Sequence, residues 1–428
     1  MTRSGYETAE SEVRYYSRLV ADELTTARNA YVRAASGTRY IDFLSGCGAL
    51  NYGHNDPDMK DALLRYVAGD GIAHSLDFHS ASRSAFLEAF TEVILKPRAL
   101  GYKIQFTGPT GTNAIEASLK LARKVTGRVN VIAFTNSFHG VSLGALSTTG
   151  DQSKRSAAGL PLAGVTRTPY PGYLGPNVDT IAWLDRVLSD PSSGIDPPAA
   201  IIVEVVQGEG GLNTASPEWL RRLRALATRH GALLIIDDVQ AGCGRTGSFF
   251  SFESSGIVPD MVVLAKSLSG FGLPLAVVLL LPEHDAWRAA EHNGTFRGNN
   301  HAFVTARVAI VKFWSGGGFP TVIESKTRVV ESALDSLQDR TGWLRKGRGL
   351  MQGLVCPTPE AAAAVQERCV EAGLLLERCG PRDEVVKLMP PLTIEPEVLR
   401  EGLSRFSDAV DLTCGERTGS RLAPAQGF

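Results

Sequence analysis

The fold of this 428-residue chain is decided by the stretch MVVLAKSLSG at residues 261–270. Its first five residues are apolar and predict a buried strand, and Lys266 follows at the carboxyl end of that strand. A second apolar run, residues 233–236, ends in Asp237. In open α/β sheets, ligands bind beyond the carboxyl ends of the strands. We therefore expect an amine and a carboxylate to meet in one crevice.

Further apolar runs alternate with amphipathic helical patterns along the chain. Strands are expected at residues 103–106, 131–134, 200–206, 233–237, 261–265 and 276–281, with helices at 113–124 and 218–230. These strands are continuous apolar runs, which is typical of parallel strands that helices cover on both faces. The pattern predicts an α/β fold.

The length of the chain suits two domains rather than one. We expect residues 1–60 to be an N-terminal segment that joins a small domain, and residues 61–305 to form the large domain. Residues 306–412 should form the rest of the small domain, and residues 413–428 a disordered tail. Residues 11–35 are predicted to be helical and then irregular.

Bulk properties exclude several classes of partner. The net charge of -1 gives no reason to expect nucleic acid, and no apolar stretch is long enough to span a membrane. The six cysteines are scattered without a CxxC pair, so we expect neither a metal site nor a disulfide framework. A reduced cytoplasmic protein is the expectation.

Two local features predict a site for a planar, phosphorylated ligand. Gly111 and Thr112 lie in a Gly/Thr-rich turn that enters a helix, where backbone amides and hydroxyls suit a phosphate. Phe138 follows the strand at 131–134, and an aromatic ring there can lie flat on a planar cofactor. Each feature alone also fits a plain role, as a helix cap or a core aromatic residue.

Two more features identify the cofactor as pyridoxal phosphate. Asp237 can pair with a pyridine nitrogen, Val239 can cover the ring face opposite Phe138, and Gln240 can reach the phenolic oxygen. Lys266 supplies an amine that can bind the aldehyde and then carry a proton. A helix N-cap and a solvated loop lysine are the ordinary alternatives for Asp237 and Lys266. The order of all four features favours the cofactor site.

These motifs in this order resemble the class III aminotransferases. The resemblance covers roughly residues 10–412 and also includes the stretches EVVQGEGG at 204–211 and GTFRGN at 294–299. It implies the type I PLP-dependent transferase fold, in which a mostly parallel seven-stranded sheet forms the large domain and both chain ends build a smaller α/β domain. It also implies small-molecule amino acid and aldehyde or keto acid substrates, and a homodimer or tetramer with shared active sites.

The resemblance assigns roles to individual residues. Lys266 carries the cofactor and Asp237 pairs with its ring nitrogen. The positions expected to contact the rest of the ring are Phe138, His139, Val239 and Gln240. Gly111 and Thr112 are expected to bind the phosphate, and Thr295 is expected to bind the phosphate of the neighbouring subunit.

Within the family, several stretches are similar to enzymes that move the amino group of L-glutamate to L-aspartate 4-semialdehyde. The products of that reaction are L-2,4-diaminobutyrate and 2-oxoglutarate. The stretches are GALNYGHN at 48–55, QFTGPTGTN at 105–113, KSLSGFGLP at 266–274 and HNGTFRGNN at 292–300. Other ω-aminotransferases of the class, acting on ornithine, acetylornithine or 4-aminobutyrate, remain alternatives, as does a PLP aminomutase or racemase.

Three residues are candidates for substrate contact. Lys387 stands before Pro390-Pro391, where many relatives have an arginine, and a lysine should hold a carboxylate more loosely. We hypothesise that Glu209 neutralises Lys387 when an ω-amine substrate binds and releases it when glutamate binds. Cys47 aligns with the pocket mouth, where it could contact the distal end of the substrate, but small-residue packing is the favoured role. The cation that binds glutamate's second carboxylate stays open, because Val141 replaces an arginine of the ornithine enzymes.

Overall fold

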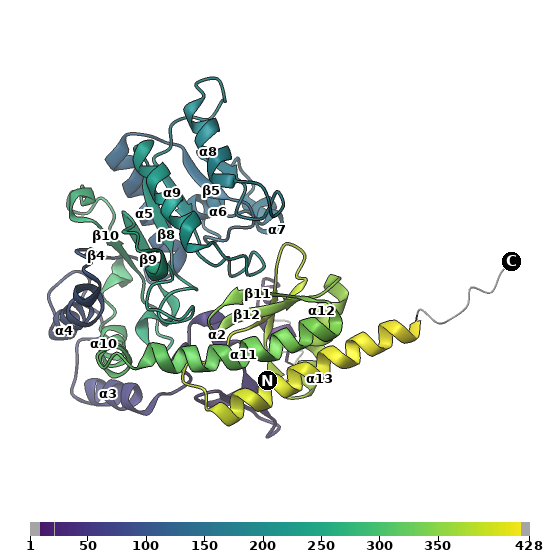
Figure 1. Ribbon diagram of the computed structural model, residues 1–428. Helices are drawn as coiled ribbons and strands as arrows, with labels where there is room; N and C mark the ends of the chain where they lie inside the picture. The colour runs from purple at the N-terminus through teal and green to yellow at the C-terminus, as the bar shows by residue number, and fades with distance from the viewer. Residues whose placement is uncertain (1–8, 21, 421–428) are drawn as a thin grey trace.

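The computed structural model describes residues 9–20 and 22–420, and a seven-stranded sheet lies at its centre (Figure 1). The five strands from β9 to β6 are parallel, and β10 runs antiparallel to β4 and β9. The expected mostly parallel sheet is confirmed. In spatial order the strands are β4 (Lys103–Phe106), β10 (Val277–Leu280), β9 (Met261–Leu264), β8 (Leu233–Asp237), β7 (Ala200–Val203), β5 (Val131–Phe134) and β6 (Val165–Thr168).

Both faces of this sheet are buried, which explains the continuous apolar runs. Ile235 and Val263 pack with α5 (Gly111–Thr126) on one face. Ile236 and Val262, one position along the same strands, pack in the other cluster with α9 (Pro217–Arg229). Two elements of this region carried no clear pattern in the sequence, namely the short polar edge strand β6 and the helix α8 (Thr180–Ser189).

The N-terminal residues form strands, so the expectation of a helix within 11–35 is wrong. Apart from the short 3-10 turn Tyr16–Arg18, this region contains β1 (Leu24–Arg28) and β2 (Tyr31–Ala34). They pair with each other, β2 also pairs with β3 (Arg39–Asp42), and β3 lies parallel to β13 (Leu374–Leu375). Strand pairing overrides the weak local pattern.

A third sheet is made by the C-terminal part of the chain. Its order is β11 (Leu344–Arg348), β12 (Met351–Val355), β15 (Val385–Leu388) and β14 (Glu377–Cys379). The helices of this region are α11 (Phe319–Thr341), α12 (Pro359–Glu371) and α13 (Pro396–Ser420), and Figure 1 shows α11 and α13 side by side. Helix α13 passes residue 413, where we expected a disordered tail; residues 421–428 lie outside the described residues.

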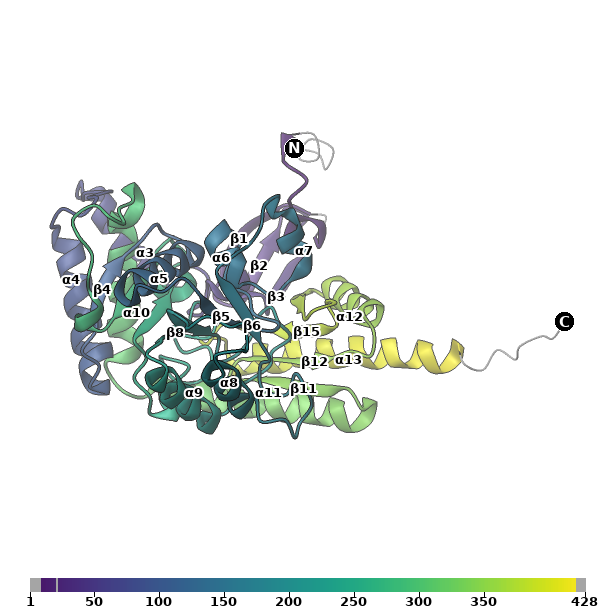
Figure 2. The same cartoon turned by 90° about the horizontal axis from the view of Figure 1, so that it is seen from above.

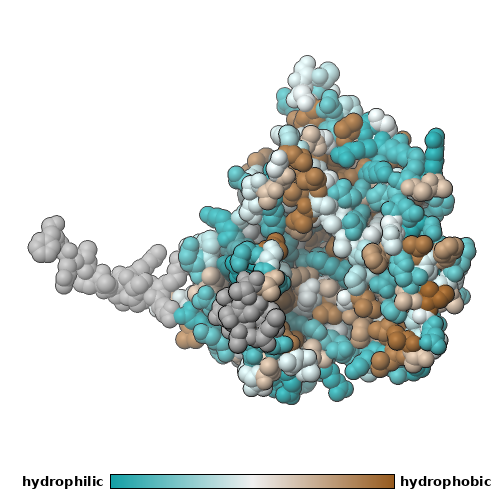
Figure 3. All heavy atoms as spheres, turned by 180° about the vertical axis from the view of Figure 1, so that it is seen from behind, coloured by the Kyte–Doolittle hydropathy of each residue, from teal (hydrophilic) through white to brown (hydrophobic). Residues whose placement is uncertain are grey.

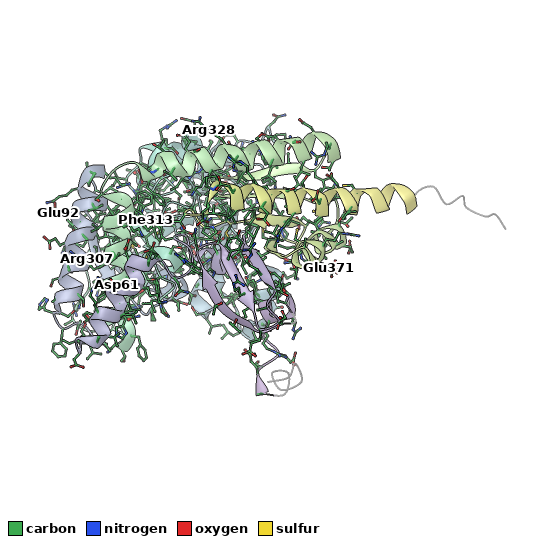
Figure 4. The ribbon with its side chains drawn as sticks, turned by 90° about the horizontal axis from the view of Figure 1, so that it is seen from below. Asp61, Glu92, Arg307, Phe313, Arg328 and Glu371 are labelled. Carbon is green, nitrogen blue, oxygen red and sulfur yellow. The ribbon has the colours of Figure 1, made fainter. Side chains whose placement is uncertain are left out.

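The helices α3 (Pro57–Ala68), α4 (Ala81–Ala89) and α10 (Asn300–Trp314) gather on the other side of the molecule (Figure 2). The remaining short helices are the π-helix Phe90–Leu95, α2 (Ser45–Gly48), α6 (Leu143–Thr148) and α7 (Gln152–Arg155). Phe313 of α10 stacks on Tyr52 at 4.8 Å between ring centroids and contacts Phe319 at the start of α11 (Figure 4). Aromatic packing therefore links α10, α11 and the loop that contains Tyr52.

The surface mixes residue types. Figure 3 shows hydrophobic residues scattered among hydrophilic ones on one face of the molecule. Within residues 9–20 and 22–420, no helix has the length and apolar character needed to cross a membrane.

Candidate active site

A cavity of about 450 Å³ opens at the carboxyl ends of the parallel strands. Asp237 at the end of β8 and Lys266 just after β9 both line it, as the position of the two apolar runs predicts. Most of the other predicted cofactor residues line the same cavity, namely Gly111, Thr112, Phe138, His139, Val239 and Gln240, together with Glu209. The fold thus brings together residues that are up to 155 positions apart, from Gly111 to Lys266.

Lys266 has an unusual backbone. Its φ is 50°, which is in the left-handed region that residues other than glycine seldom adopt. The strained residue starts the 3-10 turn Lys266–Ser269, directly after the buried strand β9. Among the described residues, none forms a hydrogen bond or ion pair with its amine, which lies at the cavity. Backbone strain at a cavity-lining amine is typical of a functional position.

Asp237 and His139 form a buried pair in the cavity wall. Asp237 Oδ2 lies 2.7 Å from His139 Nδ1, and Asp237 Oδ1 accepts a hydrogen bond from the backbone N–H of Val239 at 3.1 Å. Burial by itself lowers the pKa of His139, but the hydrogen bond and the charge of Asp237 outweigh it and raise the pKa. The histidine therefore fixes the carboxylate in one orientation. This pair was not predicted, since the sequence placed His139 only within a motif.

Glu204 adds a further carboxyl group near this pair. Its Oε2 accepts a hydrogen bond from the backbone N–H of Phe138 at 2.9 Å. Burial raises the pKa of Glu204 to about 8; the charge of His139 opposes this shift and that of Asp237 adds to it. Glu204 thus positions the backbone that carries the aromatic ring.

The amino terminus of α5 faces the cavity. Thr110 caps the helix by accepting a hydrogen bond from the N–H of Asn113, and Gly111 and Thr112 begin the first turn. A Cβ atom on Gly111 would lie 2.9 Å from Val239 Cγ1, so only glycine leaves room there. Gly140 has a φ of +120°, and a Cβ atom on it would lie 2.2 Å from Thr112 Oγ1. Amides at a helix start that glycines leave accessible are a favourable phosphate site.

The cavity residues fit pyridoxal phosphate on these observations. The site contains a primary amine, a carboxylate held by a histidine, two half-buried apolar side chains and a helix amino terminus. Its volume of about 450 Å³ leaves space for a substrate beside the cofactor. The buried atom His139 Nε2 has no protein partner, so it is available to a bound group.

Glu209 lines the cavity and contacts Lys387, as our switch hypothesis requires. Their charged atoms, Nζ and Oε1, lie 3.0 Å apart. Lys387 is fully buried and is not itself part of the cavity wall. A second carboxylate, Glu377, lies 2.8 Å from the same Nζ. No feature of the sequence analysis pointed to Glu377 as part of this site.

The other predicted contacts lie in different positions. Cys47 is outside the cavity wall, and its thiol lies 2.7 Å from the hydroxyl of Tyr16 and 3.3 Å from Glu377 Oε2. Gln240 uses Nε2 to donate to Cys47 O and to Glu209 Oε1, at 3.0 and 3.2 Å. Its Oε1 is buried without a partner. Thr295 is exposed and outside the cavity of its own chain.

Comparison with known proteins agrees with this arrangement. The family described as aminotransferase class III matches residues 15–410. A protein of Vibrio cholerae named diaminobutyrate–2-oxoglutarate transaminase is 54% identical over 398 residues, covering 92% of this chain and 96% of its own. A protein of Nocardia farcinica with the same name is 50% identical over 424 residues, covering 99% and 97%.

A solved structure shows the same fold. An S-selective transaminase from Bacillus megaterium superposes with a TM-score of 0.84, covering 96% of this chain and 97% of its own at 20% identity. The sheet order, the lysine after β9 and the extent of the family match lead to one conclusion. The chain belongs to the class III aminotransferases, whose cofactor is pyridoxal phosphate.

Proposed function

We propose that this aminotransferase moves the amino group of L-glutamate to L-aspartate 4-semialdehyde, giving L-2,4-diaminobutyrate and 2-oxoglutarate. One observation carries the proposal: relatives with that activity in their name are at least half identical to this chain over nearly all of it. The residues around the cavity, from Ala49 to Leu275, all lie within the matched region.

Lys266 and Asp237 are the proposed catalytic residues. Pyridoxal phosphate, when bound, supplies an electron sink for the negative charge that develops on the substrate carbon. The Lys266 amine would hold the cofactor and, once the substrate amine replaces it, take up and return the proton of that carbon. Asp237, held by His139 at 2.7 Å, would keep the ring nitrogen protonated.

The remaining cavity residues would position the cofactor. Phe138 and Val239 line the cavity as half-buried apolar groups, and we assign them to the two faces of the ring. Gly111 and Thr112 would bind the phosphate through the start of α5. Gln240 would have to turn from its present partners to reach the ring oxygen.

We also propose that the active protein is a homodimer or a larger assembly with shared sites. Thr295 supports this, because it is exposed and does not line the cavity of its own chain. A phosphate contact from Thr295 would therefore have to be made in a neighbouring subunit. The scattered cysteines without a CxxC pair support a cytoplasmic location.

A substrate panel tests the proposed reaction. Glutamate is offered with L-aspartate 4-semialdehyde and other aldehydes, and diaminobutyrate, ornithine and 4-aminobutyrate are offered with 2-oxoglutarate in the reverse direction. We expect diaminobutyrate to react at least tenfold faster, in kcat/KM, than the other two, a ratio that corresponds to about 1.4 kcal/mol. Equal turnover of ornithine would contradict the assignment, and activity without 2-oxoglutarate would indicate an aminomutase or racemase.

Lys266→Ala tests the attachment of the cofactor. The variant should lose the absorbance band near the visible edge that marks a cofactor bound to the lysine, and its turnover should fall by at least about a thousandfold. Lys326→Ala is a suitable control, since Lys326 Nζ donates to Leu392 O, away from the cavity. A band that persists in Lys266→Ala would place the attachment elsewhere.

A further inference from the structure

The left-handed backbone of Lys266 needs a restraint from outside its own turn. A φ of 50° costs free energy in a residue with a side chain, and it persists only where the surroundings hold it. Within the turn, the N–H of Leu268 donates a hydrogen bond to Ala265 O at 3.0 Å. Turns with a negative φ at the second residue form the same bond. The bond inside the turn therefore does not explain the conformation of Lys266.

The side chain of Ser267, the next residue, ties the turn to a distant segment. Its hydroxyl donates a hydrogen bond to Gly48 O at 2.6 Å and accepts one from the backbone N–H of Asn51 at 2.9 Å. Ser267 is 2% exposed and Asn51 is 1% exposed, so these bonds lie away from water. A buried hydroxyl thus fixes the lysine turn against residues 48–51.

The partner segment is itself held firmly through Asn51. Its Oδ1 accepts two hydrogen bonds from the guanidinium group of Arg245, at 3.0 and 2.6 Å, and its Nδ2 donates to Cys243 O at 3.1 Å. Its backbone oxygen accepts a hydrogen bond from the N–H of Leu392 at 2.7 Å. The hydroxyl of Ser267 therefore binds to a segment that three other contacts keep in place.

Both sides of this contact belong to the wall of the cavity. Lys266 lines the cavity, and so does Ala49, which lies between Gly48 and Asn51 in the chain. Rotation about the N–Cα bond of Lys266 would move its Cβ atom relative to the preceding strand β9. A change of φ at this residue would therefore redirect the amine within the cavity.

We propose that Ser267 is a positioning residue. Its hydroxyl, bound between Gly48 O and the N–H of Asn51, holds Lys266 in the left-handed conformation and so directs the amine to the cofactor. Without the hydroxyl, the backbone of Lys266 relaxes to a negative φ and the amine leaves its place. The inference rests on the proposed attachment of the cofactor to Lys266.

Ser269 offers a matched control on the same turn. It is fully buried, but within the described part of the chain its hydroxyl has no hydrogen-bond partner, and it does not line the cavity. Ser267→Ala and Ser269→Ala remove the same atom from the same turn. They differ in whether that atom joins the turn to residues 48–51.

The rate at which Lys266 becomes attached to the cofactor is the first measurement. Pyridoxal phosphate is added to the apoenzyme and the growth of the absorbance band near the visible edge is followed; borohydride reduction and peptide mass identify the modified residue. We expect Ser267→Ala to react about tenfold more slowly than the parent, and Ser269→Ala to stay within about twofold of it. Equal rates for the two serine variants would overturn the proposal.

Unfolding of chains without the lysine tests the backbone restraint separately. Glycine adopts a positive φ at little cost, whereas alanine is strained there. When the Ser267 hydroxyl is removed, an alanine at 266 relaxes and recovers part of the lost stability, but a glycine has no strain to release. Ser267→Ala should therefore lower the thermal midpoint by roughly 1–3 °C more in a Lys266→Gly chain than in a Lys266→Ala chain, both free of cofactor.

An equal loss of thermal midpoint in these two chains would also overturn the proposal, because it would show that the hydroxyl does not hold the left-handed backbone. If pyridoxal phosphate does not modify Lys266 of the parent, the proposed attachment fails instead. The comparison of the glycine and alanine chains still tests Ser267 in that case, since neither chain contains the lysine.

Discussion

His139 Nδ1 lies 2.7 Å from Asp237 Oδ2, and both side chains are buried in the wall of the cavity that Lys266 also lines. The pair orients the carboxylate in the same way that a carboxylate orients a metal-bound histidine. It connects the loop after β5 to the end of β8, two strands that are separated in the sheet by β7.

His139→Gln should weaken cofactor binding. Without the imidazole, Asp237 loses its hydrogen-bonded partner, and we expect the dissociation constant of pyridoxal phosphate to rise by about tenfold or more. Equilibrium dialysis of the apoenzyme measures it. His230→Gln is a matched control, because His230 forms a similar pair with Asp185 at 2.9 Å outside the cavity. If both variants bind pyridoxal phosphate with equal affinity, His139 does not position Asp237 for the cofactor.

Gly111→Ala should also reduce cofactor affinity, but for a steric reason. The new Cβ atom would lie 2.9 Å from Val239 Cγ1, so either the start of α5 or the side chain of Val239 must shift. We expect about a tenfold loss of affinity for pyridoxal phosphate and a smaller change in thermal stability. Gly101→Ala, which meets no atom within 4 Å, should leave both unchanged. An unchanged affinity of Gly111→Ala for pyridoxal phosphate would show that the close contact between residue 111 and Val239 is not needed for cofactor binding.

Asp238 should make stability depend on pH. Burial raises its pKa from the ordinary 3.8 to about 7, although the hydrogen bond from the N–H of Ser251 opposes this. The folded state therefore binds the proton more tightly than the unfolded state. Its contribution to the free energy of unfolding is present below about pH 4 and is lost as pH rises towards 7.

Asp238→Asn isolates this effect, since an amide cannot titrate. Thermal midpoints of the cofactor-saturated protein are measured from pH 4.5 to 7.5. From pH 4.5 to 7.5, the thermal midpoint of the parent should fall by roughly 3–5 °C more than that of the variant. Parallel curves for the two proteins would contradict the assignment.

Arg245 should be among the most sensitive positions for stability. It is fully buried and donates to Asn51 Oδ1, Leu350 O and Pro390 O, so it joins three distant segments. Arg245→Met would leave these acceptors without a donor, at a cost of about 3–5 kcal/mol. Calorimetry should show a clear fall in the midpoint. Arg328→Met, which removes an exposed ion pair with Glu324 on α11, should cost under about 1 kcal/mol (Figure 4).

Expectations from the sequence were most accurate where one local pattern decides the structure. The strands at 103–106, 131–134 and 233–237 match the structure to the residue, because each is an apolar run bounded by polar or glycine residues. The edge strand Val165–Thr168 was missed, because it is half polar and is stabilised by pairing with β5.

The site contacts that could not be predicted from the sequence join residues that are far apart in the chain. Tyr16 and Glu377 are separated by 361 positions, and the strand register that sets Glu377 opposite Lys387 has no signature in either segment. The predicted helix within residues 11–35 was wrong for a different reason, since β1 and β2 form a local antiparallel pair and β2 also pairs with β3.

The sequence by itself determined the α/β class, the places of six of the seven central strands along the chain and the positions of Lys266 and Asp237 at strand ends, because apolar runs and their boundaries are local properties. Only the tertiary structure decided that His139 holds Asp237 and that Lys387 stands between Glu209 and Glu377. Such contacts depend on the order and register of strands that are far apart in the chain, which no single segment of the sequence specifies.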